Sequence, residues 1–178
     1  MKRNFIAVLG LVLAASATVL AQMTAPAPEL KKLDYFVGNW ITEATVLPGP
    51  WGAGGKFTDN VETEWMKGGF FQVRHSEFAM PPELGGAGTT LAVLGYDADK
   101  NGYTEERFDS MGRHTAMTGT LSGDVWTWTG ETKYGGMTIQ SRLTIKMTSP
   151  TSYTSKYEVS ADGGANWMPF WDGKGTKK

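Results

Sequence analysis

The feature that most constrains the fold of this chain is a strict alternation of apolar and polar side chains. It is clearest in MTIQSRLTIKM, residues 137–147, where one parity holds Met137, Ile139, Ser141, Leu143, Ile145 and Met147. The other parity of this segment is polar throughout. Because successive side chains point to opposite faces of a β-strand, the pattern predicts an antiparallel strand with one buried face.

The same period recurs along most of the chain. Further candidate strands are the segment after Gly38 and the ranges 61–65, 70–78, 90–97, 103–109, 113–121, 125–131, 152–160 and 167–174. Short segments rich in Gly, Asp and Asn separate them, which is typical of tight turns. About ten strands with short connections pair in order and must remove their edges. We therefore predict an all-β fold, a single antiparallel up-and-down β-barrel, with a β-sandwich as the alternative architecture.

The segment PELKKLDYF, residues 28–36, predicts a short N-terminal helix. Pro28 suits a first helical turn, and Leu30, Leu33 and either Phe36 or Val37 share one face. Gly38 and Trp40 follow, and Gly38 permits a sharp turn from helix to strand.

A helix followed by Gly-x-Trp resembles the entry to a lipocalin or calycin barrel. That resemblance implies that the helix closes one end of the barrel and that Trp40 packs across its floor. Lipocalins often place an Arg from a late strand over this Trp, for which the nearest candidates are Lys174 and Arg142.

Residues 95–112, GYDADKNGYTEERFDSMG, carry a more specific resemblance. With Gly38 and Trp40, they are similar to a bacterial lipocalin-like family, domain-of-unknown-function family 1579. The matching positions are Gly95, Tyr96, Asp97, Tyr103, Asp109, Ser110, Met111 and Gly112. The resemblance spans residues 29–178 and implies a fold but no activity. Arg107 departs from the family, which often has an aromatic residue there.

The first 21 residues have the pattern of a secretory signal peptide. Lys2 and Arg3 precede an apolar run, and small residues lead up to Ala21. The apolar run is short for a membrane span of about 20 residues, which disfavours an uncleaved anchor. We expect a signal peptide at 1–21, a flexible leader at 22–29 and one lipocalin-like domain at 30–178. The mature protein is then secreted or periplasmic and has no membrane span.

Composition and motifs exclude several classes of function. The formal net charge is −1 and no basic patch is present, which argues against a nucleic-acid partner. The chain has no cysteine and no Gly-x-Ser-x-Gly, phosphate-loop or dinucleotide-binding motif. Its two histidines, His75 and His114, lack a third ligand at metal-binding spacing. The distantly similar nitrobindins hold haem through a late histidine, and this chain has none after His114. We assign no catalytic residue and no cofactor.

Two polar segments have the composition of turns. Asp97, Asp99 and Asn101 match the start of a calcium-binding loop, but Phe108 stands where such a loop needs a glutamate. A hairpin turn is the preferred interpretation, with calcium as the alternative. The segment SADGGANW resembles the Asp-box hairpin, with Ser160, Asp162, Gly164 and Trp167 at the matching positions. Structural roles are expected for Gly38, Trp40, Gly95, Tyr96, Asp97, Asp109, Asp162 and Trp167.

Aromatic residues make up 12% of the chain and suggest an aromatic barrel interior. Strand parity groups Trp126 with Trp128, Tyr153 with Tyr157, and Val73 with His75 and Glu77. We expect the interior to bind a small hydrophobic or amphipathic molecule. The candidate ligand-binding residues are Trp65, Val73, His75, Glu77, Arg107, His114, Trp126, Trp128, Tyr153 and Tyr157.

Three alternatives stay open on the sequence alone. The same side chains can simply fill the barrel as its core. An enzyme of this fold, a hydrolase or isomerase, would use titratable groups drawn from His75, Glu77, Glu105, Arg107 and His114. A structural or interaction module of the cell envelope would instead show exposed apolar patches.

Overall fold

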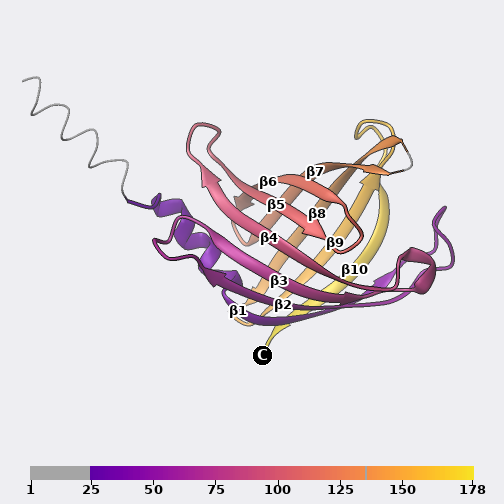
Figure 1. Ribbon diagram of the computed structural model, residues 1–178, viewed down its shortest axis with the longest axis horizontal. Helices are drawn as coiled ribbons and strands as arrows, with labels where there is room; N and C mark the ends of the chain where they lie inside the picture. Colours follow the sequence, from indigo (N-terminus) through magenta and orange to yellow (C-terminus); the bar gives the residue numbers. More distant parts are fainter. Residues whose placement is uncertain (1–24, 135) are drawn as a thin grey trace, which may run out of the picture.

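Ten antiparallel strands form a closed barrel that follows a short helix (Figure 1). This computed structural model describes residues 25–134 and 136–178. The predicted signal peptide and the first residues of the predicted leader lie outside these ranges. The elements are the 3-10 helix η1 (Pro28–Phe36), β1 (Gly38–Val46), β2 (Gly55–Trp65), β3 (Gln72–Ala79), the 3-10 turn η2 (Pro82–Leu84), β4 (Ala87–Asp97), β5 (Gly102–Asp109), β6 (His114–Ser122), β7 (Val125–Tyr134), β8 (Met137–Ser149), β9 (Ser152–Ser160) and β10 (Met168–Lys177).

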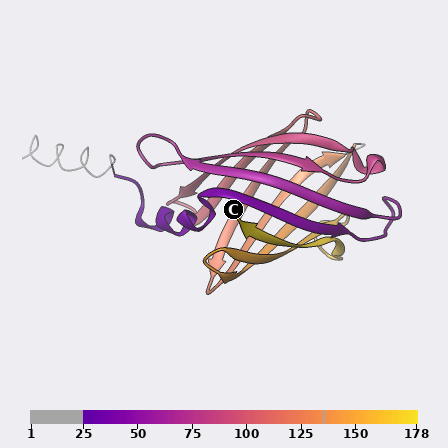
Figure 2. The same ribbon diagram turned by 90° about the horizontal axis from the view of Figure 1, so that it is seen from below.

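Each strand pairs with its neighbour in sequence, and β10 returns to pair with β1 (Figure 2). This order confirms the up-and-down barrel and excludes the sandwich alternative. The alternation that predicted the strand at 137–147 matches the structure, because Ser141 and Ile145 are buried on β8. Among the described residues, no helix is long and apolar enough to cross a bilayer.

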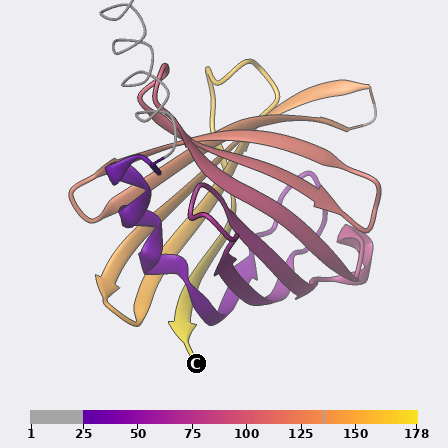
Figure 3. The same cartoon turned by 60° about the vertical axis from the view of Figure 1, so that its left-hand side comes forward.

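Helix η1 lies at one end of the barrel, where its apolar face joins the main core (Figure 3). Leu30, Leu33 and Phe36 are buried, and the Phe36 ring lies 5.5 Å from that of Trp126. Further members of this core are Trp40, Ala92, Leu94, Tyr103, Met117, Trp128, Ile145 and Tyr153.

Side chains from the barrel wall also hold the backbone of η1. The side-chain amide of Gln72 donates to the backbone carbonyl of Leu33 at 2.9 Å. The hydroxyl of Tyr103 donates to the backbone carbonyl of Glu29 at 3.0 Å. The indole of Trp65 donates to Asp34 at 2.8 Å. A short 3-10 helix leaves several carbonyls without intrahelical partners, so these bonds fix its position.

Trp40 occupies the floor of the barrel, as the Gly-x-Trp resemblance implies. Its side chain is 2% exposed, and its ring centroid lies 5.2 Å from that of Tyr153. Gly38 has a φ of 101°, a left-handed conformation that favours glycine.

The expected cation over Trp40 comes from a different residue. Lys177 pairs directly with Trp40 across β1 and β10, and its ammonium lies 5.5 Å from the indole ring. Neither Lys174 nor Arg142 takes this place. The Arg142 guanidinium instead lies 4.2 Å from the ring of Trp167, which places it over the turn between β9 and β10.

A second apolar cluster lies at the barrel end opposite η1. It consists of Ala44, Val46, Phe57 and Phe78, with Trp51, Met80, Leu84, Phe170 and Trp171 packed against them. These residues come from the end of β1, the start of β2, the end of β3, the start of β10 and the adjoining loops. The two apolar clusters therefore leave the middle of the barrel between them.

The polar segments form turns closed by their own side chains. Asp97 accepts from the backbone N–H groups of Asp99 and Lys100, and Asn101 adopts a φ of 51°. Asp109 accepts from the N–H groups of Met111 and Arg113 in the turn that follows β5. These carboxylates replace missing backbone partners, as Asx turns do.

The Asp-box segment is held in the same way. Asp162 accepts from the backbone of Asn166 at 2.9 Å, from its side-chain amide at 2.7 Å and from the hydroxyl of Ser160 at 2.7 Å. These hydrogen bonds, that from the Asn166 backbone first, lower the pKa of Asp162 to about 2.

Truncation of the floor tryptophan tests how the helix closes the barrel. Trp40→Ala removes a buried indole that contacts η1 and β9, so we expect a loss of about 3–5 kcal/mol in unfolding free energy. Met137 is 58% exposed, and Met137→Ala should change stability by about 0.5 kcal/mol or less. Denaturant unfolding of both variants checks this. Similar small shifts for the two would contradict the role given to Trp40.

The loop at 97–102 provides a test of the calcium alternative. Because Asp97 already accepts from two backbone amides and pairs with Lys100, we expect no calcium-dependent stabilisation. Thermal unfolding with excess calcium and with chelator should give equal midpoints. A higher midpoint in calcium that is lost in Asp99→Asn would establish the calcium site instead.

Candidate functional site

The side chains of β3 that face the barrel interior are not the ones expected from the sequence. Gln72, Ser76 and Phe78 are buried on this strand, whereas His75 and Glu77 are exposed. Val73 shares the outer parity and pairs across to Val93. The expectation that Val73, His75 and Glu77 line the interior is therefore wrong. The aromatic residues expected inside do face inward: Trp126, Trp128 and Tyr153 are buried, and Tyr157 shares the parity of Tyr153.

A charged cluster spans the middle of the barrel between β3 and β5. Glu105 is 2% exposed and accepts from Arg74 at 3.1 Å and from Arg107 Nε at 2.8 Å. In the sheet register, Ala92 on β4 stands directly between Arg74 and Arg107. A small side chain at Ala92 leaves room for both guanidinium groups to converge on one carboxylate.

The charges of the cluster stay in their ionised forms. Burial by itself raises the pKa of Glu105, but the charges of Arg107 and Arg74 outweigh it and hold that pKa below its usual value. The charge of Glu105 in turn raises the pKa of Arg107, against the effect of burial. Two guanidinium groups thus face the single carboxylate of Glu105.

Asp59 on β2 adds a second interior carboxyl group near this cluster. Burial raises its pKa, although a hydrogen bond with Ser76 and the charges of Arg107 and Arg74 act in the opposite direction. Its Oδ1 atom is buried and makes no hydrogen bond among the described residues. Asp59 is therefore the member of the group closest to accepting a proton.

Other buried polar atoms of the barrel share this lack of a partner within the part of the chain that the structure describes. They are Trp40 Nε1, Thr63 Oγ1, Gln72 Oε1, Trp126 Nε1 and Ser155 Oγ. A buried polar atom without a hydrogen bond costs about 1–3 kcal/mol, and native proteins contain few of them. Such atoms on the inner side of one barrel favour an interior that receives polar groups from water or from a ligand.

Aromatic rings stand on both sides of the charged cluster. Towards η1, Trp126 and Trp128 stack at 5.8 Å with an interplanar angle of 11°. Towards the other end, Tyr157 and Trp171 stack at 5.7 Å with an angle of 5°. The interior is thus polar in its middle and aromatic above and below.

The remaining predicted residues lie away from this interior cluster. His114 is exposed and contacts Glu106 at 2.6 Å, with its ring stacked 4.8 Å from that of Phe108. Trp65 is bonded to η1 through Asp34. Of the titratable groups named for an enzyme, the structure brings only Glu105 and Arg107 together inside the barrel, and both histidines are outside.

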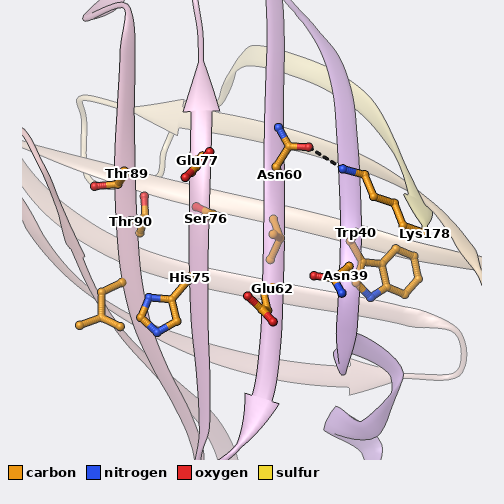
Figure 4. Close-up of a pocket in the computed structure, with 12 residues that line it drawn as sticks. Asn39, Trp40, Asn60, Glu62, His75, Ser76, Glu77, Thr89, Thr90 and Lys178 are labelled. Atoms are coloured by element: carbon orange, nitrogen blue, oxygen red, sulfur yellow. Dashed lines mark hydrogen bonds between the residues drawn. The ribbon is translucent and has the colours of Figure 1, made fainter.

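The outer face of β1 to β4 carries an open hollow of about 520 Å³ (Figure 4). His75, Glu62 and Glu77 border it, and Lys178 bonds to Asn60 at its edge. A smaller hollow of about 300 Å³ lies where η1 meets Trp65. Within residues 25–134 and 136–178, no three His, Cys, Asp or Glu side chains are grouped to hold a metal ion.

Sequence reasoning missed Asp59, Arg74 and Ser76. A signal was present for Asp59, since it shares the parity of Val61, Thr63 and Trp65, which were grouped on one face. Arg74 and Ser76 share the parity of Phe78, but the competing parity with Val73 looked equally apolar.

Comparisons with known proteins agree with this fold. The family model described as "Protein of unknown function (DUF1579)" matches residues 25–177. The crystal structure of Rv2717c from M. tuberculosis superposes with a TM-score of 0.61 at 12% identity, covering 86% of this chain and 99% of that one. An S-type phycobiliprotein lyase from Guillardia theta gives a TM-score of 0.52 at 11% identity, covering 83% and 91%. No curated protein matches the sequence at a significant level.

The raised pKa of Asp59 predicts that the stability of the protein depends on pH. Because the folded state raises the pKa of Asp59 above its reference value of 3.8, the wild type loses stability as pH rises from that value through the folded-state pKa. Asp59→Asn removes this loss. We expect the variant to gain stability relative to wild type at pH 7, and the gain to shrink towards about pH 4.

Denaturant unfolding over this pH range measures the difference. Asp172 is exposed on β10, so Asp172→Asn provides the control and should show no comparable gain. A constant stability difference between Asp59→Asn and wild type at all pH values would contradict the assignment.

Proposed function

The chain belongs to the DUF1579 family of proteins of unknown function, and we propose that it binds a small amphipathic molecule inside its barrel. The observation that carries the proposal is the interior cluster in which Arg74 and Arg107 pair with the buried Glu105, together with buried polar atoms of the barrel that lack partners among the described residues. Buried ion pairs contribute little to stability compared with apolar packing of the same volume. A chain that retains one in the middle of a barrel has a use for its polarity.

The layers of the interior match an amphipathic molecule. Stacked rings at Trp126 and Trp128, and at Tyr157 and Trp171, offer apolar surface on either side of the polar middle. Ligand sites of proteins combine such aromatic lining with a few placed polar groups. The side chain of Arg107 is 33% exposed, so the cluster remains in contact with solvent from outside.

The proposal includes a location outside the cytoplasm. It rests on the signal-peptide pattern of residues 1–21. Expression of the full chain in a bacterial host, followed by N-terminal sequencing of the protein in the periplasmic or culture fraction, tests it. A chain that retains its first residues in the cytoplasmic fraction would contradict this part of the proposal.

A ligand panel tests binding in the interior. Apolar acids, alcohols and amines, together with an environment-sensitive dye, are titrated while tryptophan fluorescence is recorded. We expect at least one member to bind saturably and to perturb the interior tryptophans. The hydroxyl of Ser155 is buried and lacks a partner among the described residues. Ser155→Val should weaken that affinity about fivefold, because a lost polar contact is worth roughly 1 kcal/mol.

The outer face supplies the matched control. His75 is exposed beside the open hollow on β1 to β4, and His75→Ala should leave the affinity unchanged if binding is internal. Circular dichroism and thermal unfolding confirm that both variants are folded. No response to any ligand, or a larger effect of His75→Ala than of Ser155→Val, would contradict an interior site.

A further inference from the structure

The interior cluster has more hydrogen-bond donors than acceptors. Glu105 engages Arg74 through Nη1 alone, and it engages Arg107 through Nε and Nη2. A guanidinium group has five N–H donors in a planar fork. The two guanidinium groups of Arg74 and Arg107 therefore present more N–H donors than one carboxylate accepts. The Arg74 guanidinium also lies 5.4 Å from the Phe36 ring, which fixes one of its faces against the closed end.

The carboxyl groups near the cluster do not take up these free donors. Glu105 is the acceptor for the printed contacts of both arginines. Asp59 lies near enough for the charges of Arg107 and Arg74 to act on its pKa, yet its buried Oδ1 atom makes no hydrogen bond among the described residues. Polar groups inside a protein normally have partners, because desolvation without one is costly. One further anion placed beside the two guanidinium groups would accept the N–H donors that Glu105 leaves free.

We infer that the polar group of the bound molecule is a carboxylate, held by the guanidinium N–H groups of Arg74 and Arg107 that Glu105 leaves free. This inference rests on the proposed function. A carboxylate offers two oxygens in the plane that a guanidinium fork recognises. The apolar part of the same molecule then lies along the stacked rings above or below the cluster. The ligand class is an apolar carboxylic acid.

Ligands with a cationic or an uncharged head group fit the cluster less well than a carboxylate. A cationic head group would meet two guanidinium groups at the cluster, and like charges in a buried site repel strongly. An alcohol has one oxygen and no charge, so it would leave more of the free guanidinium donors without an acceptor. The exposed part of Arg107 lets a charged head group reach the cluster before its apolar part is buried.

Matched ligands separate these classes in the wild-type protein. A carboxylic acid, its methyl ester, and the alcohol, amine and alkyl phosphate of the same chain length are titrated by calorimetry or tryptophan fluorescence. We expect the acid to bind about tenfold or more tightly than the ester and the alcohol, as charged hydrogen bonds of this kind provide. The amine should bind most weakly.

Two variants then locate the preference. Arg107→Gln should reduce the advantage of the acid over the alcohol to about twofold or less, because the charged partner is lost. Arg142 pairs with Glu158 and lies over Trp167, away from the cluster, so Arg142→Gln should retain the full advantage. Should Arg107→Gln unfold, Arg74→Gln and the wild-type ligand series still decide the question.

The outcomes distinguish this inference from the proposed function. Equal affinity for acid and alcohol in the wild type would overturn the carboxylate and leave ligand binding intact. A preference for the acid that persists in both Arg107→Gln and Arg74→Gln would place its recognition elsewhere and overturn the inference. An alkyl phosphate that binds more tightly than the acid would overturn the choice of carboxylate. Absence of binding by every ligand would overturn both proposals.

Discussion

The pairing of β1 with β10 is the constraint on which the rest of the structure depends. A ten-stranded sheet that stayed open would expose two unpaired edges and both of its faces. Closure removes the edges and creates an inside and an outside. It also brings Lys177 over Trp40 and lets the last residue, Lys178, donate its backbone N–H to the carbonyl of Asn39. The last strand therefore meets the first beside the floor that η1 covers.

An enclosed interior changes the free energy of burying each inward side chain. Aromatic and aliphatic residues gain stability at both ends of the barrel, whereas Arg74, Glu105 and Arg107 require one another in its middle. Their mutual arrangement engages the carboxylate of Glu105 more fully than the N–H donors of the two arginines. Protein interiors leave few polar groups without partners, so these free donors favour a site that receives one. The same interior geometry thus determines both packing and any recognition chemistry.

The sheet itself was predictable, because its signals are local. Alternation at 137–147 and Gly-rich turns between the other segments specify strands and hairpins without reference to distant residues. Turn residues such as Asp97 and Asp162 act on amides within a few positions, so their roles also follow from short motifs. Only the closure of the sheet needed the additional argument that exposed edges are unfavourable.

The interior site depended on information that is not local. In β3, both parities contain apolar and polar residues, and a shift of one position exchanges the inner and outer faces. Only the pairing of β3 with β2 and β4 places Arg74 inside and His75 outside. The sequence by itself determined the strands, their turns and the helix with Gly38 and Trp40, since each depends on neighbouring residues. Tertiary structure alone decided that Arg74, Asp59 and Glu105 share one interior, because they come from three strands whose pairing and register bring them to the same face of the sheet.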